Sequence, residues 1–244
     1  MSKAFGIVNF AGNHIQVDGL QAYRPVGAFS FLGRYRTIDF PISNMSNSGI
    51  DNIEVYVRRK PRSLTEHLGT GRHYNINSKR GQLNIMYTEN NRIGDIYSTD
   101  VAAYVENMDC IERIHLPYVV IAPSYMVYTA DYSTFLSEHI ESGADISMMY
   151  HSVDNAKEAF LNCNTLNINK QKGVLSIEPN HGNAKNKNIS MDTYVMSTEL
   201  FINLVKKAHK TSSMYTFADI LNEECEGLDI RAVSHRGYFA AICD

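Results

Sequence analysis

The chain has 244 residues, of which 44% are hydrophobic and 20% charged, a balance typical of a soluble globular protein and not of a disordered or fibrous one. Its net charge of −3 excludes the strongly basic balance of a dedicated nucleic-acid-binding protein. The cysteines lie far apart, so neither a zinc site nor a disulfide framework is expected, and reduced thiols in a cytoplasmic protein are the default. They are Cys110, Cys163, Cys225 and Cys243.

The first half of the chain alternates expected strands with expected helices. The opening residues lead directly into an apolar strand, so no signal peptide is expected, and no apolar run reaches the length of a membrane span. Apolar residues on a 3–4 spacing predict one long helix at Asp95–Arg113, and Gly49 and Gly143 are expected to end helices. The strands are expected at Ala4–Asn9, Asn52–Val57 and Tyr118–Ala122, and the other helices at Asp39–Ser48, Arg62–Leu68 and Tyr132–Ser142.

The second half contains a predicted hairpin around Asn169–Gly173 and a polar loop at Asn180–Asn188. The alternation of elements predicts an α/β fold, with a mostly parallel central sheet and helices on both faces. Ligands of such sheets bind beyond the carboxyl ends of the strands. We therefore expect the functional residues in the loops after Asn9, Val57, Ala122 and Val195. The remaining elements are strands at Asp145–Tyr150, Leu166–Ile168, Val174–Ile177, Ile189–Met196, Ile230–Val233 and Phe239–Cys243, and helices at Thr198–Lys210 and Phe217–Glu224.

Three segments carry a resemblance to a known family. Residues 33–44 read Gly-Arg-Tyr-Arg-Thr-Ile-Asp-Phe-Pro-Ile-Ser-Asn, residues 119–145 contain an apolar strand and the helix after it, and residues 189–195 read Ile-Ser-Met-Asp-Thr-Tyr-Val. Together they resemble the nucleotidyltransferase domain of glucose-1-phosphate adenylyltransferase (ADP-glucose pyrophosphorylase). The resemblance implies a Rossmann-like nucleotidyltransferase fold over residues 1–244. It also implies that the left-handed β-helix domain that follows in the family is absent from this chain.

A further segment indicates a subfamily. Residues 57–69, with Lys79, Arg80 and Gly81, are similar to the GlgD-type subunit of Gram-positive bacteria. That resemblance implies a regulatory subunit in glycogen biosynthesis, which pairs with a catalytic ADP-glucose pyrophosphorylase subunit in a hetero- or homo-oligomer. Phosphorylated sugars or nucleotides are the effectors that it implies.

The nucleotide loop of the family is degenerate in this sequence. The family has a glycine-rich loop after its first strand, where glycines let the backbone approach phosphate. Only Gly12 remains in the corresponding segment, residues 9–15. Arg24 resembles a phosphate-binding lysine of the family, although an ungapped register places Val26 there. Gly12 and Arg24 are therefore predicted as vestigial nucleotide-binding residues.

The carboxylates that the family's chemistry uses are replaced. Nucleotidyl transfer expels pyrophosphate and needs Mg²⁺ on carboxylates to offset the developing negative charge. The resemblance aligns Tyr125 and Ala241 with these two acids, and Glu178 with a lysine that holds the sugar phosphate. Neither tyrosine nor alanine suits Mg²⁺ at neutral pH. We therefore assign no catalytic residue and no metal ligand, and expect Mg²⁺ only if the protein is active.

A cationic cluster is the remaining candidate site. It consists of Arg58, Arg59 and Lys60, near Arg62, Arg72, Lys79 and Arg80, and Arg34 and Arg36 align with cationic positions of the family's regulatory region. A solvated charged face is one interpretation, and an effector, anion or subunit contact is another. Nucleic acid is disfavoured because no aromatic stacking platform accompanies the cluster. Asp39 and Asp131 are expected to cap helices.

Two hypotheses about function follow. The intact scaffold without catalytic groups favours a regulatory, catalytically degenerate subunit. The alternative is an active glucose-1-phosphate adenylyltransferase that makes ADP-glucose and pyrophosphate from ATP and glucose 1-phosphate with atypical residues. Its support is the fold-wide resemblance, which by itself indicates ancestry and not activity.

Overall fold

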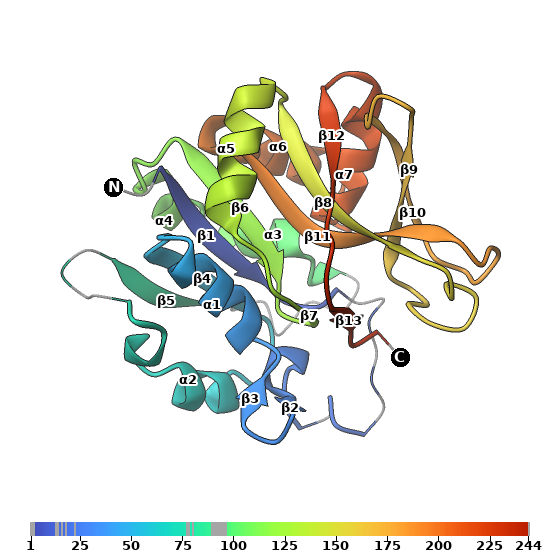
Figure 1. Ribbon diagram of the computed structural model, residues 1–244. Coiled ribbons are helices and arrows are strands. Elements are labelled where there is room, and N and C mark those ends of the chain that lie inside the picture. Colours follow the sequence, from blue (N-terminus) through green and yellow to red (C-terminus); the bar gives the residue numbers. More distant parts are fainter. Residues whose placement is uncertain are drawn as a thin grey trace.

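The protein is built on one large mixed sheet (Figure 1). The computed structural model describes residues 3–12, 15, 17, 19–21, 23–76, 79, 81–88 and 97–243. Seven strands follow the order β10-β9-β11-β6-β1-β4-β5, and β8 joins β11 to β12. The strands are β1 (Ala4–Asn9), β4 (Asn52–Val57), β5 (Gln82–Tyr87), β6 (Tyr118–Pro123), β8 (Ile146–Val153), β9 (Asn164–Ile168), β10 (Val174–Pro179), β11 (Lys187–Ser197) and β12 (Ile230–Ser234).

The strand directions confirm a mixed, mostly parallel sheet. β1 pairs in parallel with β4 and β6, and β4 with β5. β11 runs antiparallel to β6, β8 and β9, and β10 runs antiparallel to β9. Since β12 is parallel to β8, every strand of this sheet except β10 and β11 points the same way. The hairpin of β9 and β10 is confirmed.

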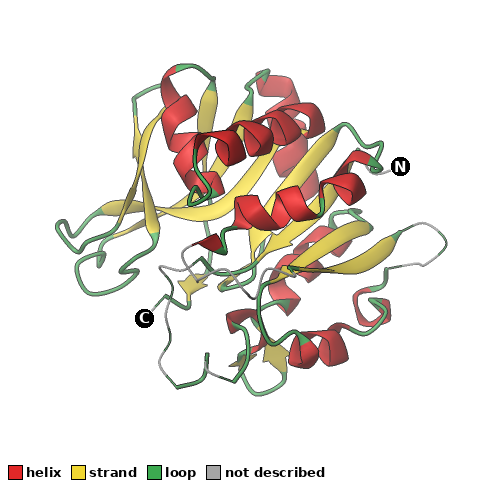
Figure 2. Ribbon diagram, turned by 180° about the vertical axis from the view of Figure 1, so that it is seen from behind, coloured by secondary structure: helices red, strands yellow, loops and turns green. Residues whose placement is uncertain are grey.

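Helices cover both faces of the sheet, as predicted (Figure 2). Neighbouring residues of a strand point to opposite faces, and in β1 Val8 packs in one buried cluster while Ile7 packs in the other. The Val8 face is covered by α1 (Asp39–Asn47), α2 (Arg62–Leu68) and α5 (Tyr132–Ser142). The Ile7 face is covered by α3 (Asp100–Glu106), α4 (Met108–Glu112), α6 (Thr198–Thr211) and α7 (Phe217–Glu223).

Short strands and single-turn helices complete the fold, and most of them were not predicted. β7 (Met126–Tyr128) pairs antiparallel with β13 (Phe239–Ala241), and β2 (Ser30–Phe31) pairs with β3 (Tyr35–Arg36). The single-turn helices are η1 (Val26–Ala28), η2 (Arg72–Tyr74) and η4 (Glu224–Glu226). β13 is shorter than the predicted strand at Phe239–Cys243, whose last two residues lie outside it.

The predicted ends of two helices are confirmed. Gly49 and Gly143 follow α1 and α5 with φ angles of 75° and 67°, a region that glycine enters without steric cost. Asp131 caps α5, because its carboxylate accepts the backbone N–H of Ser133 at 2.9 Å. Hydrogen bonds from the side chains of Ser133 and Thr134 lower the pKa of Asp131 to about 2.

The prediction of one helix at Asp95–Arg113 is wrong in its extent. Residues 95 and 96 lie outside the described residues, and α3 begins at Asp100, where the Thr99 hydroxyl accepts the N–H of Ala102. Asn107 separates α3 from α4. Its side-chain amide donates to the Ala103 carbonyl at 2.9 Å, and such side-chain bonds to the backbone compete with helix propagation.

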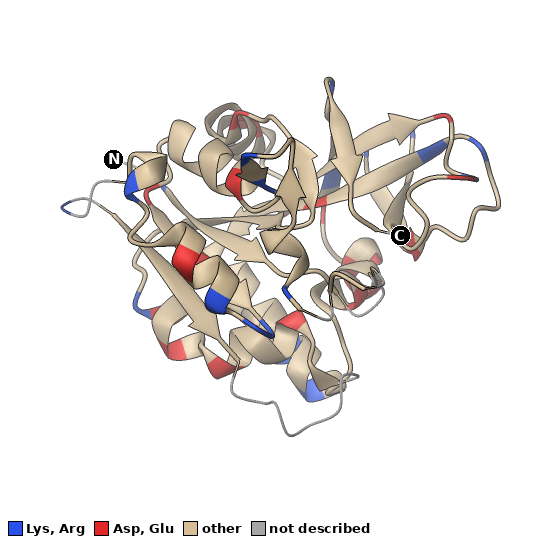
Figure 3. Cartoon of the chain, turned by 90° about the horizontal axis from the view of Figure 1, so that it is seen from below, with Lys and Arg blue, Asp and Glu red and all other residues tan. Residues whose placement is uncertain are grey.

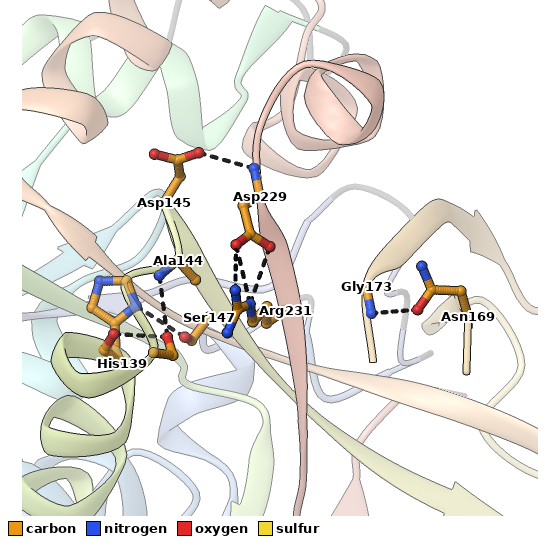
Figure 4. A network of polar contacts seen from close by, with 9 residues as sticks. His139, Ala144, Asp145, Ser147, Asn169, Gly173, Asp229 and Arg231 are labelled. Carbon is orange, nitrogen blue, oxygen red and sulfur yellow. Dashed lines mark hydrogen bonds and ion pairs between the residues drawn. The ribbon is translucent and has the colours of Figure 1, made fainter. Parts of the chain in front are cut away.

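A buried histidine ties α5 to the sheet (Figure 4). His139 is 4% exposed, and its Nδ1 lies 2.9 Å from the hydroxyl of Ser147 on β8. Desolvation by burial lowers the pKa of His139, because it disfavours the charged ring. The unfolded chain therefore binds this proton more readily than the folded chain.

The free energy of unfolding is therefore expected to decrease as the pH is lowered through the range in which histidine titrates. The stabilisation by neutral His139 is complete above the unfolded pKa of about 6.5 and is lost as the pH falls toward the lower folded value. The His139→Gln variant, which can still bond to Ser147, should lose less stability than the native protein between about pH 7.5 and pH 5. Urea unfolding at both pH values measures this, and parallel losses in the two proteins would contradict it.

No helix in the described part of the chain is both long and apolar enough to traverse a bilayer.

Candidate active-site pocket

A pocket of about 270 Å³ opens where β1 and β6 end. Asn9 and Pro123, the last residues of these strands, line it, together with residues that begin α3 and α7. Three of the four predicted loops lie at this edge, but the loop after Val195 does not. β11 runs antiparallel to β6, with Ser197 opposite Tyr118, so the middle of β11 faces the pocket instead.

Tyr125 and Asp192 form the centre of the pocket wall. The Tyr125 hydroxyl donates a short hydrogen bond to Oδ2 of Asp192. The other carboxylate oxygen accepts from the hydroxyls of Ser190 at 2.9 Å and Tyr194 at 3.1 Å. Burial raises the pKa of Tyr125 well above its usual value, and the neighbouring Asp192 charge raises it further. Tyr125 is therefore a neutral donor.

Asp192 has an unusual backbone. Its φ is 43°, and it lies where the pairing of β11 with β8 shifts register between Ser190 and Tyr194. Residues other than glycine rarely adopt this conformation, and Asp and Asn are the ones that tolerate it best. In the family motif that resembles residues 190–195, glycine stands at this position. Asp192 therefore presents a carboxylate from a backbone conformation that favours glycine.

Asp100 also lines the pocket. It accepts hydrogen bonds from Asn9 Nδ2 at 3.0 Å and from the backbone N–H groups of Val101 and Phe217. Burial raises the pKa of Asp100 despite these bonds. Oδ1 of Asn9 is buried and has no hydrogen-bond partner within the described residues. The carboxylate of Asp100 is held by protein donors.

The two vestigial nucleotide-binding residues are separated. Gly12 lines the pocket, whereas Arg24 is exposed and is not among the residues that line it. Residues 13 and 14 of the predicted loop lie outside the described residues. Val26, the alternative to Arg24, is buried at the start of η1. Of these three residues, Gly12 is the one at the pocket.

The positions that the resemblance equates with the metal carboxylates do lie together. Ala241 pairs with Met126, and the N–H of Ile242 donates to the carbonyl of Tyr125 at 2.9 Å. A neutral phenol and a methyl group offer Mg²⁺ no carboxylate oxygen, the ligand that it prefers. Within the described residues, no three His, Cys, Asp or Glu side chains form a potential metal site. These residues do not fit the metal that the family chemistry requires.

Glu178 lies outside this pocket wall. Its carboxylate accepts hydrogen bonds from the side chains of Asn167 and Ser176, both at 2.9 Å, whereas Pro179, the next residue, lines the pocket. Glu178, which the resemblance aligns with a lysine that holds the sugar phosphate, is therefore not among the lining residues. The carboxylates that line the pocket are those of Asp100, Asp192 and Asp219.

The cationic cluster follows β4 at the same edge of the sheet. Arg58 is half-buried, and burial and the neighbouring Arg59 lower its pKa. Arg59 and Lys60 are exposed, and Lys60 Nζ lies 6.0 Å from the ring centroid of Tyr23. Arg80 lies outside the described residues. Figure 3 shows Lys and Arg interspersed with Asp and Glu along the described chain.

Arg34 and Arg36 have different surroundings. Arg34 is exposed between β2 and β3, whereas the Arg36 guanidinium donates to the Ser63 carbonyl in α2. The Arg36 N–H donates to Asp39 at 2.8 Å, and Asp39 also bonds to His67 at 2.6 Å. Asp39 thus joins α1 to α2. The prediction that it caps a helix is wrong, because α1 begins at Asp39 itself, after Ile38, and no side-chain capping bond is present.

Sequence reasoning missed Asp192 as a site residue. The sequence did contain a signal for it. The resemblance aligns Asp192 with a glycine of the family motif and Tyr125 with an acidic residue. The contact between them spans 67 residues and depends on the pairing of β11 with β6. Neither change alone reveals that the two side chains meet.

Comparisons with known proteins agree with this architecture. A family model described as "Nucleotidyl transferase" matches residues 12–230. The glycogen biosynthesis protein GlgD of Geobacillus stearothermophilus is 26% identical over 235 residues, which are 94% of this chain and 57% of that protein. The glucose-1-phosphate adenylyltransferase of Clostridioides difficile (strain 630) is 31% identical over 186 residues, 75% of this chain and 47% of that protein.

A solved structure from Bacillus anthracis, assigned as a glucose-1-phosphate thymidylyltransferase, superposes with a TM-score of 0.77 at 13% identity. The match covers 98% of this chain and 89% of that one, and it confirms the expected fold. The chain spans about half the length of the curated relatives that it matches.

Proposed function

The chain belongs to the nucleotidyl transferase family, and we propose that it is a regulatory, catalytically degenerate part of an ADP-glucose pyrophosphorylase in glycogen biosynthesis. The similarity to both GlgD proteins and glucose-1-phosphate adenylyltransferases supports the pathway. The hydrogen bond from Tyr125 to Asp192 carries the regulatory assignment. The resemblance aligns Tyr125 with a metal carboxylate of the family, and its role as a neutral donor supports the absence of catalysis.

We propose that the protein acts in the cytoplasm, where it modulates a catalytic ADP-glucose pyrophosphorylase subunit within a hetero- or homo-oligomer. The proposed effectors are phosphorylated sugars or nucleotides, and the candidate residues for them are Arg34, Arg58, Arg59 and Lys60. Exposure of Arg34, Arg59 and Lys60 supports this assignment. Arg36 is a weaker candidate, because its guanidinium already donates to the Ser63 carbonyl.

A two-component assay tests the regulatory role. Addition of this protein to a catalytic glucose-1-phosphate adenylyltransferase from the same cell should raise the rate of ADP-glucose formation or change its response to sugar phosphates. The Arg59→Ala/Lys60→Ala variant should weaken the change in effector response, and Lys206→Ala, in the exposed pair with Glu112, serves as the control. Failure of the two proteins to associate and to influence each other would contradict the role.

The second candidate function is an active glucose-1-phosphate adenylyltransferase with atypical residues. The pocket at the ends of β1 and β6 supports it, because ligands of such sheets bind there. This candidate requires charge stabilisation from groups other than Tyr125 and Ala241.

A further inference from the structure

The charge of the pocket does not suit a phosphorylated ligand. Three carboxylate residues line it, namely Asp100, Asp192 and Asp219, and no Lys or Arg occurs among its described lining residues. Sites that bind phosphate present cations or clusters of backbone N–H groups. A phosphate in this pocket would instead face like charges in a partly desolvated space, which is unfavourable.

The same carboxylates already accept hydrogen bonds within the protein. Asp192 accepts from three hydroxyls and from Asn164 Nδ2 at 3.5 Å, and Asp100 accepts from Asn9 and two backbone N–H groups. Asp219 accepts the N–H of Thr216 at 2.8 Å in the capping box of α7. These neutral donors do not cancel the negative charges, so the carboxylates still disfavour an anion at short range.

The remaining lining groups are those that bind sugar hydroxyls. Asn162 offers a donor and an acceptor, and Ser98 adds a hydroxyl. Asn164 offers its amide oxygen, while its Nδ2 donates to Asp192 at 3.5 Å. Phe10 and the ring of Tyr194 add flat apolar faces, which suit the C–H faces of a pyranose. The volume of about 270 Å³ is near the lower end of small-molecule pockets. A pocket of this volume accommodates a ligand of monosaccharide size.

We propose that this pocket binds one uncharged hexose unit, free or at the end of a short oligosaccharide, and discriminates against the phosphorylated sugar. The hydroxyls of the sugar exchange hydrogen bonds with Asn162, Asn164 and Ser98, and its apolar face lies against an aromatic ring. The inference stands apart from the regulatory role, since a saccharide can occupy the pocket whether or not the protein acts on a partner.

Isothermal titration of the full chain with glucose, maltose and glucose 1-phosphate tests the proposal. Glucose or maltose should bind with a dissociation constant in the millimolar range or tighter, and glucose 1-phosphate at least about tenfold more weakly. Equal or tighter binding of glucose 1-phosphate would overturn the proposal. So would the absence of heat from both uncharged sugars at about 20 mM.

Two substitutions in β9 test whether the sugar binds in the pocket or elsewhere on the surface. Asn164→Ala, at the start of β9, should weaken glucose or maltose binding about two- to tenfold through the loss of a hydrogen bond. Its control is Asn167→Ala on the opposite face of β9, where Asn167 bonds to Ser176 and Glu178. Equal effects of the two variants would contradict the location.

A second pocket variant distinguishes a lost contact with the sugar from a loss of binding caused by misfolding. Asn162 has a φ of 65°, which glycine adopts without strain, so Asn162→Gly removes the side chain and preserves the backbone. It should also weaken binding about two- to tenfold, with an unchanged melting temperature. Unchanged affinity in both pocket variants would overturn the assignment of this site.

Discussion

The Asp192→Ala variant is expected to lose about 3–5 kcal/mol of unfolding free energy, the largest stability effect of any single substitution considered for this pocket. The carboxylate accepts hydrogen bonds from Tyr125 and Tyr194, which are 2% and 5% exposed. Without it, both hydroxyls remain buried and lose an acceptor, at a cost of about 1–3 kcal/mol each. Alanine at a φ of 43° adds backbone strain of roughly 1 kcal/mol.

Asp192→Asn separates these contributions. Asparagine tolerates the same backbone conformation and keeps one acceptor oxygen, so this variant should lose only about 1–2 kcal/mol. The control is Asp229→Ala, which removes the exposed pair with Arg231 and should change stability by no more than about 1 kcal/mol.

Chemical denaturation of the four proteins at neutral pH measures the effect. The expected order of stability is native and Asp229→Ala, then Asp192→Asn, then Asp192→Ala. An Asp192→Ala protein as stable as Asp229→Ala would show that the contact between Tyr125 and Asp192 does not hold the pocket wall together.

Most of the sheet could be predicted because its buried strands are runs of apolar residues in the sequence. The continuous apolar run at Tyr118–Ala122 is a strand between two helical layers, and it ends at Pro123. Edge strand β5 was missed, because Gln82–Tyr87 carries only one buried residue, Met86, and mixes polar with apolar positions. Three-residue β7 is too short for its pattern to stand out.

The ends of helices could be predicted where a side chain or glycine decides them locally. Asp131 and Gly143 bound α5 for such reasons. The break at Asn107 was not predicted, because apolar spacing continues from Tyr104 to Ile111 on the same buried cluster. An asparagine side chain that bonds to the carbonyl of Ala103 ends α3 without interrupting that spacing.

The candidate site could be predicted in part. The resemblance located Tyr125 and Ala241, and the fold brings them together through the pairing of β7 with β13. The role of Asp192 depends on a bulge in β11 and on contact across 67 residues, which no local pattern encodes. The surroundings of Arg36 and Glu178 were likewise decided by tertiary contacts.

Catalytic incompetence is the prediction with the largest expected effect. A bound metal ion stabilises the charge that develops in the transition state of such reactions by several kcal/mol. Each 1.36 kcal/mol of activation free energy changes the rate about tenfold. Tyr125 is a neutral donor bonded to Asp192, and Ala241 lies beside it. We therefore expect the protein alone to be at least about a thousandfold slower than a catalytic relative.

The most direct test of this account is ADP-glucose formation from ATP and glucose 1-phosphate by the purified protein alone, with Mg²⁺ present. The glucose-1-phosphate adenylyltransferase of Clostridioides difficile, a relative of this chain, serves as the positive control. The account predicts no ADP-glucose above the rate without protein. Product that forms at a rate proportional to the amount of protein added would contradict it.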